Sequence, residues 1–194
     1  MTGTRGRPRS EDARRAILRT ALELCERHGY QELTIKSIAE TAGVGRQTLY
    51  RWWPDKASIL LESLTDLAAR HPALDAADEP GPVLDGVEEL LTTTFELARS
   101  VTGQALVGLM SDAQRDPALS ARLQETVIGP RRAALRTLLQ RGVDAGEFAA
   151  GTSLDLAVDF AFGAMWYRLL GRHAPVDAAL AREVTAAIAA TLAP

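Results

Sequence analysis

Several residue types are scarce in this 194-residue chain, and each scarcity excludes a class of protein. A single cysteine, Cys25, excludes an internal disulfide framework and fits the reducing cytoplasm. The three histidines, His28, His71 and His173, stand far apart, and none has metal-ligand spacing with cysteine or carboxylates. The chain contains no GxSxG, P-loop or GxGxxG motif. We therefore expect no catalytic site, no metal site and no cofactor.

Long apolar runs are also absent. The most apolar stretch, residues 154–170, is interrupted by Asp155, Asp159 and Arg168, so no segment is expected to span a membrane. The N-terminus carries arginines without an apolar segment, which excludes a signal peptide. Aromatic residues make up only 5% of the chain and no useful strand pattern appears, whereas alanine and leucine are abundant. The composition predicts an all-α, cytoplasmic protein of one or two domains.

Charge is divided unevenly along the chain. The whole sequence has 22 basic and 25 acidic residues, a net charge of −3, which alone argues against a nucleic-acid binder. Residues 1–56, however, hold 11 basic and 7 acidic residues, which gives net +4 and leaves −7 for the remainder. This asymmetry fits a basic, DNA-facing domain joined to an acidic body.

The strongest cluster of positive charge lies at the N-terminus. Residues 5–9 read Arg-Gly-Arg-Pro-Arg and resemble the core of an AT-hook, which can place arginines in a narrow minor groove. The alternative is a solvated tail, which the segment should be when free in solution. We expect residues 1–10 to form a flexible basic arm, and we treat Arg5 and Arg7 as candidate DNA contacts.

Residues 33–60 carry the signals of two short helices around a tight turn, followed by a third helix. Thr34 can cap the first helix, because its hydroxyl can accept from an unpaired backbone N–H. Gly43 can end that helix in the left-handed conformation. Pro54 stops the second helix and Asp55 can cap the third. The arrangement is typical of a helix-turn-helix.

The second of these helices carries the residues suited to reading DNA. Arg46 and Gln47 stand in its first turn, where a recognition helix faces base edges in the major groove. Arginine can pair with guanine and glutamine with adenine. Tyr50 and Arg51 suit phosphate oxygens, and so does Lys56 at the start of the next helix. Residues 50–53 read Tyr-Arg-Trp-Trp. Taken alone, such an aromatic cluster would more often be part of the core and its solvated edge than a binding surface.

Residues 14–60 resemble the DNA-binding domain of the TetR/AcrR family of bacterial transcriptional regulators. The resemblance implies a three-helix DNA-binding domain, an α-helical ligand-binding and dimerisation domain, and usually repression that a small molecule relieves. It also implies phosphate contacts from Thr34, Tyr50 and Lys56 and base contacts from Arg46 and Gln47. The matching residues are Ile17, Leu18, Ala21, Leu22, Gly29, Tyr30, Leu33, Thr34, Ile38, Ala39, Ala42, Gly43, Val44, Thr48, Leu49, Tyr50 and Lys56.

Three positions depart from the family pattern. Gly45 stands where a Ser or Thr cap is common, Cys25 where a Phe is common, and Trp52-Trp53 replaces a more usual aromatic pair. The departures leave the predicted fold intact but give Trp52 no obvious partner. The predicted DNA-binding residues are Arg5, Arg7, Thr34, Lys36, Arg46, Gln47, Thr48, Tyr50, Arg51, Trp52 and Lys56.

The rest of the chain reads as further helices, about nine in total. We expect a helix-turn-helix domain at residues 11–56 and a ligand-binding and dimerisation domain at 57–194. Asp116-Pro117 should start a helix that Pro130 kinks or splits. A linker is expected at 72–82, and the remaining helices at about 55–70, 83–101, 103–114, 154–171 and 177–192.

The last two helices, at 154–171 and 177–192, are the expected homodimer interface, as in the family; an ordinary internal helix pair is the alternative. Small residues on the first permit close approach of another helix. The effector is expected among the helices from about residue 55 to residue 171, although each candidate residue is more often plain core. No charged constellation predicts a class of ligand. The candidate cavity walls are Phe95, Leu106, Met110, Leu123, Phe162 and Trp166.

The sequence thus predicts a dimeric, sequence-specific transcriptional regulator, a repressor released from a pseudo-palindromic DNA operator by a small-molecule effector. Protein two-fold symmetry would match the two half-sites. One alternative is a sequence-tolerant architectural DNA binder, which the net charge of −7 on residues 57–194 disfavours. An enzyme is the third and least supported reading.

Overall fold

The computed structural model describes residues 7–70, 81–149, 151 and 153–193, and within these ranges all regular structure is helical. Segments α7, η2 and α8 follow one another without a break, so the ten α-helices and one π-helical segment make nine continuous rods, which confirms the all-α prediction. The elements are α1 (Arg7–His28), α2 (Ile35–Ala42), α3 (Arg46–Trp52), α4 (Lys56–Ala68), α5 (Val83–Arg99), α6 (Thr102–Ala113), α7 (Pro117–Leu123), η2 (Gln124–Ile128), α8 (Gly129–Asp144), α9 (Leu154–Gly171) and α10 (Ala178–Leu192).

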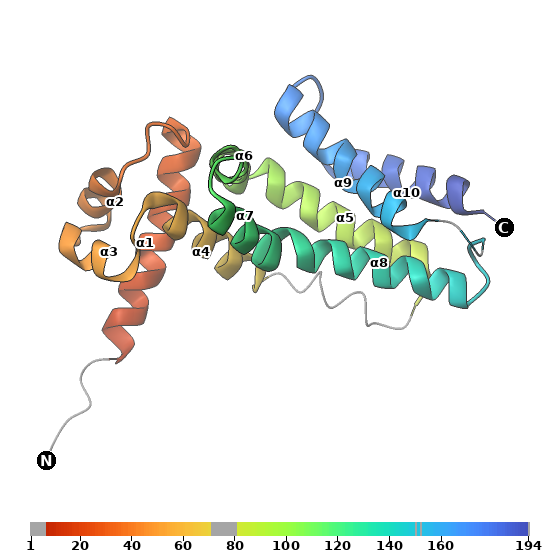
Figure 1. Ribbon diagram of the computed structural model, residues 1–194, viewed down its shortest axis with the longest axis horizontal. Helices are drawn as coiled ribbons and strands as arrows, with labels where there is room; N and C mark the ends of the chain where they lie inside the picture. Colours follow the sequence, from red (N-terminus) through yellow and green to blue (C-terminus); the bar gives the residue numbers. More distant parts are fainter. Residues whose placement is uncertain (1–6, 71–80, 150, 152, 194) are drawn as a thin grey trace, which may run out of the picture.

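The molecule is elongated, with α2 and α3 at one end and the α9–α10 pair toward the other (Figure 1). Helix α1 begins at Arg7, inside the segment expected to be a flexible arm, so the boundary at residue 10 is corrected. Arg5 lies outside the described residues, as does most of the expected linker at 72–82.

The caps of α2 explain why this short helix ends where it does. The Thr34 hydroxyl accepts from the Ser37 backbone N–H at 3.0 Å, and the Ser37 hydroxyl accepts from the Thr34 N–H at 3.2 Å. This reciprocal pair satisfies two backbone donors that the helix itself leaves unpaired. At the other end, Gly43 takes a left-handed conformation with φ of 67°. Both caps confirm the sequence prediction.

Helix α3 has a weaker start. Gly45 precedes it and makes no side-chain cap, as expected, so α3 depends on packing through Leu49, which is fully buried. The next helix is well capped, because the Asp55 carboxylate accepts from the Ser58 N–H at 2.7 Å. Together these features hold α3 between two firmly ended helices.

Pro130 shapes the longest rod of the fold. Proline has no N–H and its ring crowds the carbonyl four residues earlier, so an undisturbed α-helix is disfavoured. The chain forms the π-helical turn η2 instead, in which the Gly129 N–H donates to the Gln124 carbonyl. A Cβ atom at Gly129 would lie 2.6 Å from that oxygen, so the turn depends on glycine. The predicted kink is therefore a π-turn, and the rod does not split.

The apolar residues form two cores. The first joins the DNA-binding helices α1–α3 to α4, α6 and α7, through residues such as Ile17, Leu60 and Leu109. The second lies among α5, α8, α9 and α10, with Leu91 and Leu135 at its centre. Helices α4, α6 and α7 thus pack with the DNA-binding helices, although they lie beyond residue 56 in the sequence. The boundary between the two cores, rather than residue 56, is the main seam of the molecule.

Candidate nucleic-acid interface and ligand cavity

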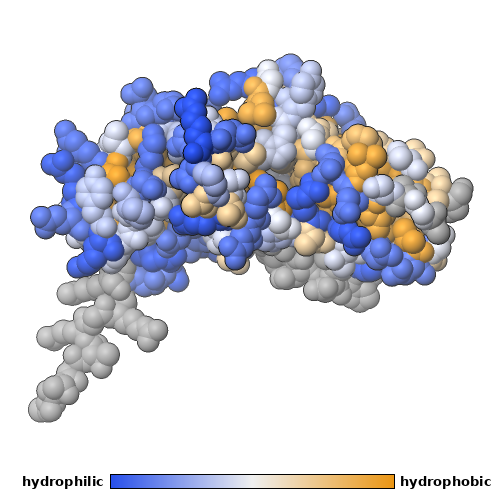
Figure 2. Space-filling view, viewed as in Figure 1, coloured by the Kyte–Doolittle hydropathy of each residue, from blue (hydrophilic) through white to orange (hydrophobic). Residues whose placement is uncertain are grey.

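The predicted DNA-reading side chains lie on the outside of α2 and α3, at one end of the molecule. Thr34, Lys36, Arg46, Gln47 and Tyr50 are exposed, while Leu49 between them is buried and fixes the orientation of α3. Tyr50 is 58% exposed, which is unusual for a large aromatic residue in a domain with a formed core. The surface at this end is mostly hydrophilic (Figure 2).

The positive charges on α3 are available to an anion. Among the described residues, no carboxylate forms an ion pair with Arg46 or Arg51. The Arg51 guanidinium lies 5.7 Å from the centre of the Trp52 ring, and Trp52 in turn meets Trp53 edge-on with ring centres 5.4 Å apart. On α2, Lys36 has only a long contact of 3.9 Å with Glu40. Thr48 is half-buried beside them.

Lys56 forms hydrogen bonds within the protein that the sequence did not predict. Its ammonium donates to the Tyr30 carbonyl at 2.6 Å and to the Gln31 carbonyl at 3.3 Å, and it lies 4.4 Å from the centre of the Tyr30 ring. An ammonium group has three donors, so these bonds hold the turn after α1 and leave at most one direct donor. A phosphate contact from Lys56 stays a prediction, and any such contact shares the group with the turn.

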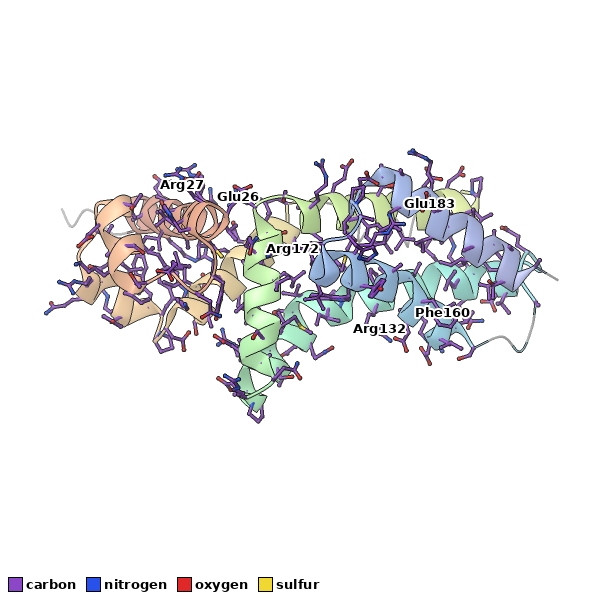
Figure 3. All side chains as sticks on the ribbon, turned by 90° about the horizontal axis from the view of Figure 1, so that it is seen from above. Glu26, Arg27, Arg132, Phe160, Arg172 and Glu183 are labelled. Carbon is purple, nitrogen blue, oxygen red and sulfur yellow. The ribbon has the colours of Figure 1, made fainter. Side chains whose placement is uncertain are left out.

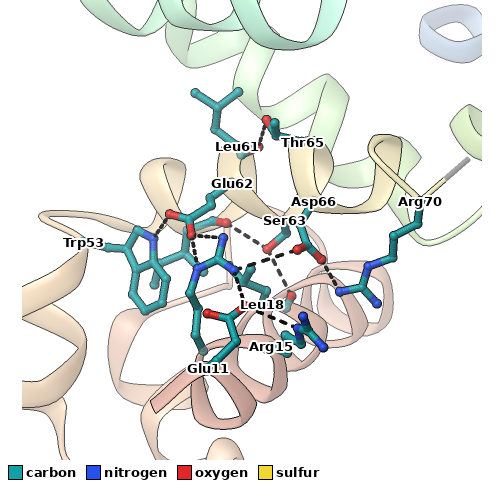
Figure 4. Close-up of polar contacts among 12 residues, drawn as sticks. Glu11, Arg15, Leu18, Trp53, Leu61, Glu62, Ser63, Thr65, Asp66 and Arg70 are labelled. Carbon is teal, nitrogen blue, oxygen red and sulfur yellow. Dashed lines mark hydrogen bonds and ion pairs between the residues drawn. The ribbon is translucent and has the colours of Figure 1, made fainter. Parts of the chain in front are cut away.

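Trp53, which follows α3, and Arg14 of α1 both bond the Glu62 carboxylate of α4. Figure 4 shows Trp53 and Glu62 within this network of polar contacts. The Trp53 indole donates to Glu62 at 2.6 Å, and the Arg14 Nε donates to the other oxygen of Glu62 at 2.6 Å. Trp53 is only 3% exposed, so its N–H requires such a partner. Arg14 also contacts Glu11 at 3.0 Å and Asp66 at 3.8 Å. This network fixes the base of α3 on a rigid support.

Tyr30 joins the DNA-binding helices to α6. It is 4% exposed, and its phenol donates a hydrogen bond to the Asp112 carboxylate. Burial and the neighbouring carboxylate raise the pKa of Tyr30 far above its usual range. Its ring lies so close to Gly108 that a Cβ atom there would come within 2.0 Å of the Tyr30 Cγ. Sequence reasoning missed this contact, because 82 residues separate Tyr30 from Asp112.

A cavity of about 240 Å³ lies at the seam between the two cores. Three predicted wall residues, Leu106, Phe162 and Trp166, line it together with residues from α4, α5, η2 and α8. The other three do not line it. Phe95 is fully buried in the second core, Leu123 is 1% exposed in the first core, and Met110 packs against that core. All six predicted residues are apolar and recur at helical spacing. Their sequence pattern therefore cannot distinguish a residue of the cavity wall from a residue of the core, and only the tertiary structure does so.

The cavity also holds charged residues that the sequence analysis did not select. Arg131 and Arg132 of α8 and Asp159 of α9 line it, and Arg132 pairs with Asp159 at 2.5 Å. Figure 3 labels Arg132 of α8 and Phe160 of α9, the residue after Asp159. The sequence pattern indicates no charged group at the cavity, whereas the structure places Arg131, Arg132 and Asp159 there. The π-turn caused by Pro130 was the available signal, since such turns are frequent at functional sites.

Helix α9 exposes a stripe of large apolar side chains on the face opposite its core side. Phe160 is 64% exposed and Tyr167 is 71% exposed, and Leu156 and Leu170 continue the stripe. Beside it, mostly apolar residues of α9 and α10, such as Ala161, Ala164 and Ile188, line a groove of about 180 Å³. The inner faces of α9 and α10 pack in the second core, and the opposite face of α9 is exposed.

Two negative observations concern only the described residues. In the ranges given above, no helix is both long and apolar enough to cross a bilayer. Within the same ranges, no group of three or more His, Cys, Asp or Glu residues is placed to hold a metal ion.

An exposed recognition helix on a capped helix-turn-helix, joined to a second helical core, defines a transcriptional regulator that binds DNA. Residues 17–63 match the model of the bacterial regulatory proteins of the tetR family, and residues 77–188 match that of the tetracyclin repressor-like C-terminal domain. The chain belongs to the TetR family of bacterial transcriptional regulators, which are not enzymes.

Known proteins support the same assignment. The HTH-type transcriptional regulator YdeS of Bacillus subtilis (strain 168) is 32% identical over 174 residues, which cover 88% of this chain and 84% of that protein. The regulator Mb1581 of Mycobacterium bovis is 28% identical over 162 residues, 82% of this chain and 77% of its own. The crystal structure of FadR from Bacillus subtilis in complex with stearoyl-CoA matches with a TM-score of 0.74 at 20% identity, covering 91% and 98% of the two chains. This last likeness concerns the fold.

Proposed function

We propose that the protein is a homodimeric repressor that binds a pseudo-palindromic operator and is released from it by a small molecule. The observation that carries the proposal is the position of the cavity, at the seam between the core that holds α3 and the core of α5, α8, α9 and α10. A ligand in that seam touches both halves. Occupancy can therefore change how the DNA-binding helices are held against the rest of the protein.

Different residues of the helix-turn-helix are proposed to contact the bases and the phosphates of DNA. Arg46 and Gln47 reach base edges from its first turn, and Thr34, Tyr50 and Arg51 contact phosphates. Lys36, Thr48 and Trp52 lie beside them as further candidate contacts. Because phosphate contacts bind all sequences alike, only the base-reading pair should determine the preferred operator.

Dimerisation is proposed to use the uncovered face of α9 and α10. The stripe from Leu156 to Leu170 is the kind of exposed apolar surface that marks a protein interface. A two-fold dimer would place two copies of α3 on successive major-groove segments of one face of the duplex. Such a dimer would act in the cytoplasm, where the chromosome lies.

The test of the DNA-binding step is a titration of the full chain against its own promoter region and against random DNA of equal length, at matched salt. We expect specific binding that Arg46→Ala weakens by about 1–3 kcal/mol at one operator position. Arg99→Ala, which removes the same charge from the end of α5, serves as the control and should bind as the parent does. Equal affinity for both DNAs would instead favour the sequence-tolerant architectural binder.

The dimer is tested by sedimentation of Phe160→Glu, which puts a charge in the centre of the exposed stripe. We expect this variant to sediment as a monomer and to bind the operator weakly. The matched control is Ala118→Glu, at an exposed position of α7. A dimeric Phe160→Glu protein would show that the interface lies elsewhere.

A further inference from the structure

The seam cavity carries one net positive charge. Its charged lining residues are Arg131, Arg132 and Asp159. Arg132 and Asp159 form an ion pair at 2.5 Å and cancel one another. Arg131 remains as the one described lining residue whose charge is not balanced by another lining residue.

Arg131 is half-buried, and no described carboxylate pairs with it. Its Nη1 donates to the Val127 carbonyl at 3.2 Å, within the π-turn that Pro130 imposes. Burial lowers the pKa of Arg131. A guanidinium has five N–H donors, and the Val127 carbonyl is the one acceptor among the described residues that Arg131 contacts. Partial loss of water around a charge has a free-energy cost, which an anion bound beside the guanidinium would reduce.

The remaining walls are apolar and offer few competing polar groups. The hydroxyls of Thr94 and Thr102 already donate to the carbonyls of Leu90 and Leu97. Trp166 lines the cavity, and no described group accepts a hydrogen bond from its indole N–H. The apolar lining residues include Leu64, Leu67, Leu106, Val127, Phe162 and Met165. The cavity therefore combines an apolar wall with one unpaired cation and one spare neutral donor.

The size of the cavity limits the ligand. Its volume of about 240 Å³ lies just below the range of roughly 300–1,000 Å³ that is usual for sites of drug-sized ligands, so a small organic molecule is expected. A single positive charge matches a monoanion such as a carboxylate better than a phosphate monoester, which carries close to two charges at neutral pH. Carboxylates also suit the bidentate geometry of a guanidinium.

We propose that the effector is a small amphipathic carboxylic acid whose carboxylate pairs with Arg131 and whose apolar body fills the seam. The inference rests on the proposed function, in which this cavity is the effector site. Neutral molecules of the same shape leave the guanidinium unpaired, and amines add a second positive charge, so both bind less well. Specificity for an acid thus comes from Arg131, in the first turn of α8 directly after η2.

Isothermal titration calorimetry of the full chain with sodium octanoate and sodium 4-phenylbutanoate tests the proposal, with 1-octanol and 4-phenylbutan-1-ol as the matched neutral molecules. At least one acid should bind tenfold or more tightly than its alcohol. Arg131→Gln should weaken binding of that acid at least tenfold and leave the alcohol unchanged, whereas Arg131→Lys should retain part of the preference. Arg136→Gln, which removes the same charge from an exposed position of α8 outside the cavity, should bind as the parent does.

The titration separates this inference from the proposed repressor function, because it needs no DNA. If the protein binds its operator but neither acid binds more tightly than its alcohol, the inference fails and the repressor function stands. If Arg131→Gln binds the acid as the parent does, the inference also fails. If the acid binds through Arg131 and operator affinity does not fall, the ligand class stands and effector-driven release fails.

Discussion

The phenol of Tyr30 donates a hydrogen bond to the carboxylate of Asp112, and this bond joins the turn after α1 to α6. Helix α6 also contributes Thr102 and Leu106 to the wall of the seam cavity. One helix therefore touches both the cavity and the base of the DNA-binding unit. A movement of α6 that accompanied ligand binding would be passed directly to Tyr30.

Tyr30→Phe should lower the free energy of unfolding by about 1–3 kcal/mol, because a hydrogen bond to a charged group is lost while the ring remains in place. Urea unfolding measures this. Tyr50→Phe is the matched control, since Tyr50 is 58% exposed and no described residue bonds its phenol. Asp112→Asn should lower the free energy of unfolding by less in the Tyr30→Phe protein than in the parent protein. Full additivity would mean that the two groups do not interact.

Gly108→Ala should destabilise the protein, against the usual trend. In an exposed helix interior, alanine is favoured over glycine by about 1 kcal/mol. At Gly108, however, the added Cβ would lie 2.0 Å from the Tyr30 Cγ, so the ring or α6 must shift. Gly163→Ala on α9 is the control, because nothing lies within 4 Å of its Cβ position, and it should be neutral or stabilising. A stabilised Gly108→Ala protein would show that α6 and Tyr30 separate without cost.

Features that depend on neighbouring residues could be predicted from the sequence. The caps at Thr34, Gly43, Asp55 and Asp116 all form, because each involves groups no more than five positions apart. The same holds for the amphipathic faces that define the helices. Local physics therefore determined most of the secondary structure, including the shape of the helix-turn-helix.

Features that depend on distant residues could not be predicted. Nothing local distinguishes Leu106, which lines the cavity, from Phe95, which is buried in the second core. Lys56 reads as a phosphate contact until its bonds to the Tyr30 and Gln31 carbonyls are seen. Arg131 reads as one of many surface arginines until the packing of α8 against the seam places it in an apolar cavity.

Lys56→Met should destabilise the fold as well as weaken DNA binding. The substitution removes two hydrogen bonds to carbonyls, and the partly exposed position limits the loss in unfolding free energy to about 1–2 kcal/mol. Lys36→Met removes the same charge from an exposed position with one 3.9 Å contact, so its unfolding free energy should change by less than about 0.5 kcal/mol. Equal urea midpoints for the two variants would contradict the internal role of Lys56.

Cys25 should make stability depend on alkaline pH. It is fully buried, and burial raises the pKa of its thiol to about 11, with the nearby Lys56 acting in the opposite direction. In the unfolded chain the thiol loses its proton near pH 8.5, whereas the folded protein keeps it. The folded state therefore binds the proton more tightly, and this part of the stability is complete below about pH 8.5 and is lost as the pH rises toward 11.

The measurement compares urea unfolding of the parent and of Cys25→Ala at pH 8 and pH 10.5. Both proteins lose stability through other groups that titrate in this range, so the difference between them isolates the thiol. We expect the advantage of the parent over Cys25→Ala to shrink by up to about 2 kcal/mol between the two pH values. A constant difference would mean that Cys25 titrates alike in the folded and unfolded states, and that the thiol is reached by water in the folded protein. Rapid reaction of the native thiol with a water-soluble disulfide reagent at pH 8 would lead to the same conclusion.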